Sequence, residues 1–365
     1  YQYRKDKVRI QVEGKYQVAK LENNQIFPKP DELDKSYPSI QPTVRFDYNF
    51  TKNNRLEFDY DTWTDQPSVG QLQDVINNSN PLQLKTGNSD LNQSYHNRLR
   101  FKYRANFSEK EQNLFVFAQS SFVANSIVNS SVIANETTEL EEGIVLQEGS
   151  QLIKPENVDG YWYVRSYISF GQPVTYLKSN LGLNGSINYT HRPSLFNQTL
   201  SYINSSDFWL GLSLSSNISE KIDFNISTRS SYNIVENTLR PSLNNNYFRQ
   251  VTRLSYDWIF GDGFSYRMNL NHQLNTGLSE GYNNSYVLLN LSLGKKFLKN
   301  KRAEMSVSVY DLLAQNNNIS RTVTELYVQD YQSNVLQRYV MLNFTYNLRH
   351  FNKGTTEDDY EELYN

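Results

Sequence analysis

Charged residues alternate along two stretches of this sequence, and the two stretches carry opposite signs. The first carries carboxylates and the second carries cations: Glu57, Asp59 and Asp61, then Arg98, Arg100, Lys102 and Arg104. Side chains two positions apart share one face of a β-strand, and opposite charges on adjacent strands attract each other. We therefore predict a charged ladder across two paired strands. Such a ladder could have a functional role, by holding a plug segment or by lining a pathway. It could instead be a solvated part of the wall whose charges only pair with one another.

The sequence shows few of the residue patterns that mark common enzymes and metal sites. We find no HExxH motif, no phosphate-binding glycine loop and no calcium-loop spacing. The sequence has no cysteine, so thiolate ligands and disulfides are excluded. The four histidines fall on separate predicted strands or strand edges: His96, His191, His272 and His350. We interpret them as polar side chains rather than metal ligands, and the sequence predicts neither an enzyme nor a cofactor.

The elements that must position the ladder are β-strands, because apolar residues recur at every second position. In 208–215, for example, Phe208, Leu210 and Leu212 alternate with Gly211 and Ser213. The same period recurs in 181–189, 222–234, 264–274, 287–293, 303–309 and 340–348. Such alternation favours strands with one apolar face. The runs are longer than the ~5–6 residues usual in soluble sandwiches and approach the ~9–11 residues that cross a bilayer.

These observations predict an all-β fold, an antiparallel transmembrane β-barrel with about fourteen strands in this chain. The predicted strands are 6–20, 40–51, 54–65, 94–107, 112–127, 160–170, 177–191, 204–217, 221–235, 248–260, 263–276, 283–297, 302–314 and 335–350. A mean hydropathy of −0.67 fits this interpretation, because every second residue of a barrel strand faces a polar lumen. The formal net charge of −2 argues against a nucleic-acid partner.

The predicted connections alternate in length. Short turns follow the second, fourth, eighth, tenth and twelfth strands, whereas the other connections are mostly long: 21–39, 66–93, 128–159, 192–203, 236–247 and 315–334. Outer-membrane barrels combine short periplasmic turns with long extracellular loops. We therefore expect the barrel to occupy 1–351 and the acidic segment 352–365 to be a periplasmic tail.

The ladder and the apolar rows should lie on opposite faces of the barrel wall. A charge that faced lipid at mid-bilayer would cost ~2–4 kcal/mol, so the ladder should point into the lumen while the Leu, Phe and Ile rows contact outer-membrane lipid. Aromatic residues near the predicted strand ends suit interfacial belts: Trp63, Tyr161, Trp162, Trp209, Tyr256, Trp258 and Tyr339. The predicted location is the cell outer membrane of a Gram-negative bacterium.

Short motifs near both ends of the chain resemble those of the TonB-dependent receptor family. They are Tyr37-Pro38-Ser39, Leu56-Glu57-Phe58-Asp59-Tyr60, Asn80-Pro81-Leu82, Gly87-Asn88-Ser89-Asp90-Leu91, Tyr310-Asp311-Leu312-Leu313 and Leu342-Asn343-Phe344-Thr345-Tyr346-Asn347-Leu348. Ser89 stands where the family usually has proline. The resemblance implies a barrel of about 22 strands around a plug, used for energised ligand uptake. It also implies that Leu342, Phe344, Tyr346 and Leu348 form the strand read by the barrel-assembly machinery.

Two departures from that family leave two functions open. This sequence lacks a plug, the energy-coupling motif and about eight of the family's strands. One hypothesis is ligand uptake across the outer membrane, with this chain as part of a larger receptor barrel. The alternative is a smaller, closed barrel with a structural or assembly role in a larger outer-membrane complex. The expected partners are outer-membrane lipid together with a plug domain, other outer-membrane subunits or surface lipoproteins. A soluble adhesin is a third, weaker interpretation.

Overall fold

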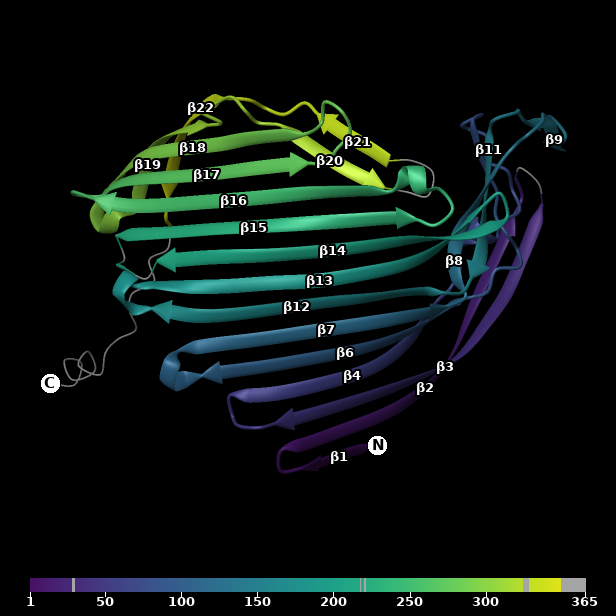
Figure 1. Ribbon diagram of the computed structural model, residues 1–365, viewed down its shortest axis with the longest axis horizontal. Helices are drawn as coiled ribbons and strands as arrows, with labels where there is room; N and C mark the ends of the chain where they lie inside the picture. The colour runs from purple at the N-terminus through teal and green to yellow at the C-terminus, as the bar shows by residue number, and fades with distance from the viewer. Residues whose placement is uncertain (28–29, 217, 220, 324–327, 349–365) are drawn as a thin grey trace.

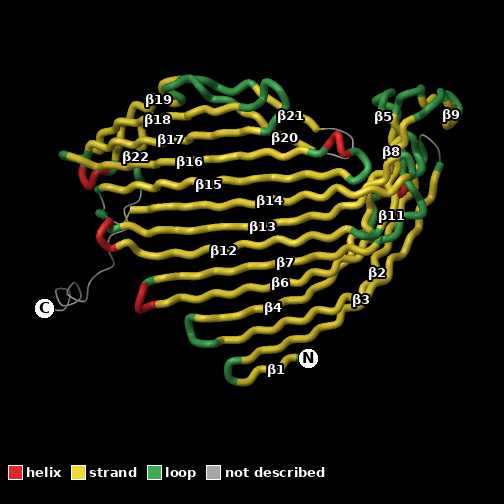
Figure 2. Tube along the Cα trace, in the orientation of Figure 1, coloured by secondary structure: helices red, strands yellow, loops and turns green. Residues whose placement is uncertain are grey.

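The computed structural model describes residues 1–365 except 28–29, 217, 220, 324–327 and 349–365. Most described residues lie in β-strands that run side by side in a single curved sheet, seen in Figures 1 and 2. The strands that build the wall are β2 (Val8–Gln25), β3 (Asp31–Asn49), β4 (Asn54–Asp65), β6 (Ser94–Phe107), β7 (Gln112–Ala124), β12 (Tyr161–Val174), β13 (Ser179–Phe196), β14 (Thr199–Ser216), β15 (Ile222–Asn237), β16 (Asn245–Phe260), β17 (Phe264–Thr276), β18 (Asn284–Phe297), β19 (Ala303–Tyr310) and β22 (Tyr339–Tyr346). The all-β, antiparallel prediction is confirmed.

The predicted number of strands is wrong, because the structure contains strands outside the wall. The described residues form 22 strands, of which 18 belong to one sheet. The additional strands are β1 (Gln2–Lys5), β5 (Gln83–Lys85), β8 (Ser126–Ile133), β9 (Thr138–Glu141), β10 (Ile144–Leu146), β11 (Gln151–Val158), β20 (Asn318–Val323) and β21 (Val328–Ser333). The helices are short: α1 (Val69–Leu72), η1 (Ser108–Lys110), η2 (Thr175–Leu177), η3 (Pro241–Leu243) and η4 (Lys299–Lys301).

Several segments predicted as long loops continue the pairing of the wall strands. The segment predicted as the loop 21–39 is mostly strand, since β2 pairs with β3 as far as Gln25 opposite Asp31. The segment 192–203 is the end of a hairpin whose turn residues Asn197 and Gln198 have φ of 46° and 61°, as a two-residue hairpin turn requires. Pairing persists there because backbone hydrogen bonds do not require apolar side chains.

The wall has two faces, which the register defines. One face, here called the polar face, carries Glu57, Lys102, Tyr167, Trp209 and Arg229, and paired strands keep it continuous from β2 to β22. The opposite, apolar face carries most of the exposed large hydrophobic side chains: Leu181, Leu183, Ile187, Phe208, Leu210, Leu212, Ile226, Leu293, Met305, Val307, Val340, Leu342 and Phe344.

The sheet keeps two unpaired edges among the described residues. β22 pairs with β19, and β2 pairs with β1 and β3, but no register joins β22 to β1 or β2. The short turns predicted after the second, fourth, eighth, tenth and twelfth strands lie at one end of the wall, and α1, β5, β8 to β11 and the β20–β21 hairpin lie at the other (Figure 1). The predicted tail 352–365 lies outside the described residues.

Candidate functional site: the polar face of the sheet

The charged ladder joins β4 to β6 in the register that the sequence suggested. Glu57 lies opposite Lys102, Asp59 opposite Arg100 and Asp61 opposite Arg98. Arg100 Nη2 donates to Asp61 Oδ1 at 3.0 Å, and Lys102 Nζ lies 3.4 Å from Glu57 Oε2. Arg98 also donates to Asp61. The structure therefore brings six of the predicted ladder residues into ion pairs.

The ladder extends to β3, which sequence reasoning did not include. Arg45 Nε donates to Asp59 Oδ1 at 3.0 Å. Arg55 Nη2 donates to Asp47 Oδ1 at 2.9 Å. The Asp59 and Asp47 side chains are only 7% and 4% exposed, and a buried carboxylate needs such partners to offset its desolvation. Each carboxylate in this part of the polar face consequently has a cationic partner.

Arg104 differs from the other predicted ladder residues. It lies opposite Arg55 in the register, and its guanidinium carbon is 5.8 Å from the centroid of the Phe115 ring. No carboxylate among the described residues forms an ion pair with Arg104. The ladder of ion pairs between β4 and β6 therefore ends at Glu57 and Lys102 and does not include Arg104.

The described histidines contact aromatic rings or polar side chains on different strands. His96 stacks on Trp63 with a centroid distance of 4.6 Å and lies 3.0 Å from Asp65 Oδ2. His191 stacks on Tyr202 at 4.3 Å, and His272 Nε2 lies 3.0 Å from Ser285 Oγ. Within the described part of the chain no three His, Cys, Asp or Glu side chains gather around one point.

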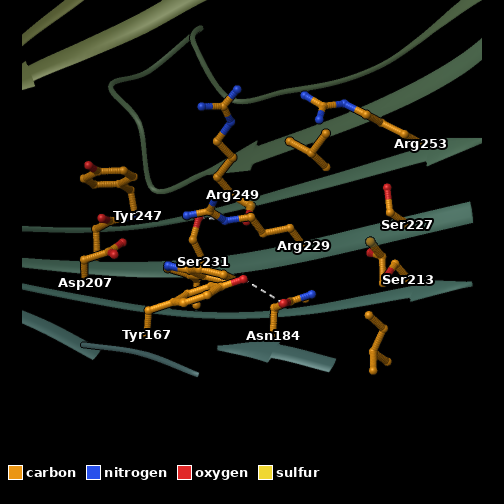
Figure 3. A pocket seen from close by; sticks show the side chains of 16 residues that line it. Tyr167, Asn184, Asp207, Ser213, Ser227, Arg229, Ser231, Tyr247, Arg249 and Arg253 are labelled. Carbon is orange, nitrogen blue, oxygen red and sulfur yellow. Dashed lines mark hydrogen bonds between the residues drawn. The ribbon is translucent and has the colours of Figure 1, made fainter. Parts of the chain in front are cut away.

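A second site on the polar face lies farther along the wall, over β12 to β16. It is a pocket of ≈ 630 Å³, here called the arginine pocket, shown in Figure 3. Its lining includes Tyr167, Asn184, Asp207, Trp209, Ser213, Ser227, Arg229, Ser231, Asn233, Tyr247, Arg249 and Arg253. The aromatic and cationic side chains come from β12, β14, β15 and β16, within a run of five strands that the register holds side by side.

The polar contacts of the arginine pocket leave its cations without carboxylate partners. The Arg229 guanidinium carbon lies 4.0 Å from the centroid of the Trp209 ring. Arg249 Nη2 donates to Gln273 Oε1 at 3.3 Å. Asp207, the one carboxylate in the lining, accepts a hydrogen bond from Asn188 at 2.9 Å. Among the described residues, no ion pair forms between a carboxylate and Arg229, Arg249 or Arg253.

The β20–β21 hairpin is anchored at one end of this pocket. Arg321 donates to both carboxylate oxygens of Asp330, to Asn245 Oδ1 at 2.6 Å and to the Gly277 carbonyl at 2.8 Å. Its guanidinium carbon lies 5.9 Å from the ring of Tyr247, a lining residue of the pocket. The Arg321 guanidinium holds the pKa of Asp330 well below its usual range.

One serine nearby has the spacing of a hydrolase nucleophile, which sequence reasoning missed. Gly277-Leu278-Ser279-Glu280-Gly281 fits GxSxG, but this segment joins strands β17 and β18, whereas the nucleophile elbow joins a strand to a helix. Ser279 Oγ accepts a hydrogen bond from Arg321 at 3.2 Å, and its backbone amide donates to Asp330. We assign Ser279 to the anchor of the hairpin.

Among the described residues, the apolar face is exposed and the buried apolar core is small. Leu210, Leu342 and Phe344 are 57%, 68% and 62% exposed. The one cluster of buried apolar residues among those described consists of Leu33, Leu72 and Leu91, at the end of the wall that carries α1. A contiguous exposed apolar surface of this extent requires a partner such as lipid.

The family comparison agrees with this surface. The model of the "Outer membrane protein beta-barrel family" matches residues 13–346, which is nearly all of the wall. The chain belongs to this family. Its location in the outer membrane follows, as the sequence predicted, and the exposed apolar rows are the surface that contacts lipid. The family is broader than the TonB-dependent receptors, so the match supports the barrel rather than that specific type.

Solved structures resemble this outer-membrane barrel only distantly. A FadL homologue of Pseudomonas aeruginosa has 9% identity, with 94% of this chain and 91% of that chain covered and a TM-score of 0.34. The toluene transporter TodX of P. putida has 9% identity, coverage of 95% and 92%, and a TM-score of 0.25. Nothing about this chain is inferred from likenesses at this level. No curated protein matches the chain. Among the described residues, no helix combines the length and hydropathy needed to cross a membrane.

Sequence reasoning missed the arginine pocket, although a usable signal was present. Trp209 was assigned to an interfacial belt, whereas the register places it on the polar face beside Ser186 and Ser231. Arg229, Arg249 and Arg253 occupy odd positions, opposite to the apolar rows of their strands. A comparison of charges across these two neighbouring strands, as was made for the ladder, would have revealed an excess of cations.

Proposed function

We propose that this chain forms part of the wall of an outer-membrane passage, through which a water-soluble ligand is taken up. The proposal rests on one observation. The same strands present a continuous polar face on one side and an exposed apolar face on the other. Charged side chains on the polar face would cost ~2–4 kcal/mol each at mid-bilayer if they faced lipid. The polar face therefore borders a water-filled space, and the ladder and the arginine pocket point into it.

The two charged regions of this face support different roles. Each carboxylate of the ladder has a cationic partner, so the ladder holds β3, β4 and β6 in register and keeps the wall stable in contact with water. The arginine pocket is not neutral within the described residues, and it offers aromatic surface beside the cations. The pocket is consequently the part of the face that can recognise a passing molecule.

Uptake can be tested with the full-length protein purified from its native outer membrane and reconstituted in liposomes. We expect swelling, or entry of small radiolabelled solutes, that exceeds the value for protein-free liposomes. Solute entry equal to that control, together with stable co-purification of other outer-membrane subunits, would support the structural subunit instead.

The finer proposal, uptake of the TonB-dependent type, is supported by the sequence motifs quoted above. It is tested separately in cells, because energised uptake depends on the inner-membrane proton gradient while passive passage does not. If the proposal holds, a protonophore should reduce uptake in cells to the passive level measured in liposomes. Uptake in cells that is unchanged when the gradient collapses would leave a passive barrel.

A further inference from the structure

The arginine pocket carries an excess of positive charge that no ion pair among the described residues balances. Its lining contains Arg229, Arg249 and Arg253 but only one carboxylate, Asp207. In the ladder, by contrast, nearly every charge has a partner within 4 Å. Like charges on neighbouring strand positions destabilise a sheet. Departures from favourable local pairing are expected where a site serves a function.

The register places the three arginines at neighbouring positions of the polar face. Ser231 lies opposite Arg249, Val251 opposite Arg229, and Ser227 opposite Arg253. Arg229 therefore lies diagonal to both other arginines, at backbone separations of roughly 7–8 Å. Arginine side chains are long enough to span such a gap, and each presents several N–H donors that match the oxygens of a carboxylate or phosphate.

Aromatic surface and neutral polar groups complete the pocket. Tyr167, Trp209 and Tyr247 contribute rings, and Figure 3 shows Tyr167 and Arg229 turned towards the same space. Tyr167 Oη donates to Asn184 Oδ1 at 2.8 Å, which orients the ring. Aromatic faces favour planar or apolar groups of a ligand. The volume of ≈ 630 Å³ lies within the ~300–1,000 Å³ usual for small-molecule sites.

We propose that the arginine pocket binds a small organic anion. Its carboxylate or phosphate group is held by Arg229, Arg249 and Arg253, and its ring or apolar part lies against Tyr167 and Trp209. This inference rests on the proposed function, because it names the class of molecule that the passage selects. An inorganic anion would use only the cationic half of the pocket, whereas an organic anion uses both halves.

The test measures binding of phenyl phosphate to the full-length protein in detergent, by calorimetry and by the change in tryptophan fluorescence. We expect saturable binding that weakens as salt is added, since the contact is between charges. The double variant R229Q/R249Q should bind on the order of tenfold more weakly or worse, because it removes charge-assisted hydrogen bonds to the anion. Phenol and inorganic phosphate should each bind more weakly than phenyl phosphate.

The matched control is R165Q/R192Q, which removes two positive charges from neighbouring strands at positions that do not line the pocket. It should bind phenyl phosphate as the unmodified protein does. Both variants must show the heat-dependent gel mobility of a folded barrel before they are compared. Equal binding by R229Q/R249Q and the unmodified protein would overturn the proposal. So would phenol or inorganic phosphate binding as tightly as phenyl phosphate.

Binding and passage are measured separately, so the two proposals can fail independently. Tight binding that depends on the arginines, without solute entry into liposomes, would sustain the anion site and overturn uptake. Solute entry that shows no preference for anions and no effect of R229Q/R249Q would sustain uptake and overturn the anion site.

Discussion

Arg321 and Asp330 face each other across the β20–β21 hairpin and form a two-point ion pair. Their side chains are only 3% and 2% exposed, and Ser279 supplies a third contact through its backbone amide, 2.9 Å from Asp330 Oδ2. Because Arg321 also reaches Asn245 and the Gly277 carbonyl, one arginine fastens the hairpin to the ends of β16 and β17. This anchor sets the position of the hairpin beside the arginine pocket.

The substitution Asp330→Asn should release the hairpin without unfolding the wall. It leaves the buried Arg321 guanidinium without its carboxylate, and loss of one partner of a buried pair costs roughly 3 kcal/mol or more. Amide hydrogen exchange in β20 and β21 should therefore accelerate on the order of a hundredfold, while exchange in β14 and β15 stays unchanged. Glu280→Gln, at an exposed position in the adjoining loop, is the control. Unchanged exchange in the hairpin of Asp330→Asn would show that the ion pair does not hold it.

The same ion pair predicts how the hairpin responds to acid. The pKa of Asp330 is lowered in the folded protein, chiefly by hydrogen bonds from Arg321. Its stabilisation is thus fully present above the ordinary Asp pKa of about 3.9 and is lost as pH falls through the lower folded-state pKa. Exchange in the hairpin, corrected for the intrinsic rate, should be constant from pH 7 to 5 and rise only below about pH 4. A rise already between pH 7 and 5 would assign the response to another group.

The wall strands could be predicted from the sequence because the bilayer dictates their pattern. In β14, the residues between Phe208 and Leu214 must alternate between lipid and water, so the period of two is visible in the residue types. The strand extensions near Gln25, Asp31 and Phe196 lie beyond the apolar rows, and there either face can carry polar residues. Hydropathy therefore does not show where the pairing of these strands ends. The count of about fourteen strands fell short of 22 because the additional strands, such as β5 and β8 to β11, lie in the connections and lack long apolar rows.

The ladder and the pocket differ in how much the sequence reveals. Glu57, Asp59 and Asp61 form a visible row, and the next wall strand supplies the matching row of cations. The pocket requires Tyr167, Trp209, Arg229 and Arg249 to come together from four strands. Each strand contributes only one or two of these residues, and the twist and curvature that bring them together depend on the whole sheet.

The two faces of β17 predict opposite tolerances to charge. Leu270 lies opposite Leu254 and Leu289 on the apolar face, and the adjacent Asn269 lies opposite Ser255 and Asn290 on the polar face. Leu270→Lys should lower the free energy of unfolding from lipid vesicles by ~2–4 kcal/mol, because it places a charge in hydrocarbon. Asn269→Lys is the matched control and should change this free energy by less than about 1 kcal/mol. Similar losses for both variants would contradict the assignment of the faces.

The ladder predicts that reversing one of its charges destabilises the protein more than exchanging the charges of an ion pair. In the unmodified protein, Arg98 and Arg100 both contact Asp61. Asp61→Lys places a third cation beside them. We expect a loss of unfolding free energy of roughly 1–3 kcal/mol in urea titrations from lipid vesicles. Adding Arg98→Asp should restore part of that loss, with a coupling of at least about 0.5 kcal/mol in the double-mutant cycle. Additive losses would mean that the two side chains do not interact in the membrane.

The unpaired edges of the sheet predict the result of a cysteine cross-linking experiment. Open sheet edges do not occur in hydrocarbon, because each unsatisfied backbone group there costs several kcal/mol, so β22 and the outer edge of β2 must meet some partner. In the described residues they do not meet each other, and we expect further strands to lie between them.

Val12→Cys with Leu342→Cys should therefore form no disulfide under oxidation. Val307→Cys with Leu342→Cys, at register partners on β19 and β22, should form one readily, since paired positions have the separation a disulfide needs. The chain has no native cysteine to interfere. A disulfide between positions 12 and 342 would instead show a wall that closes on itself as a small barrel.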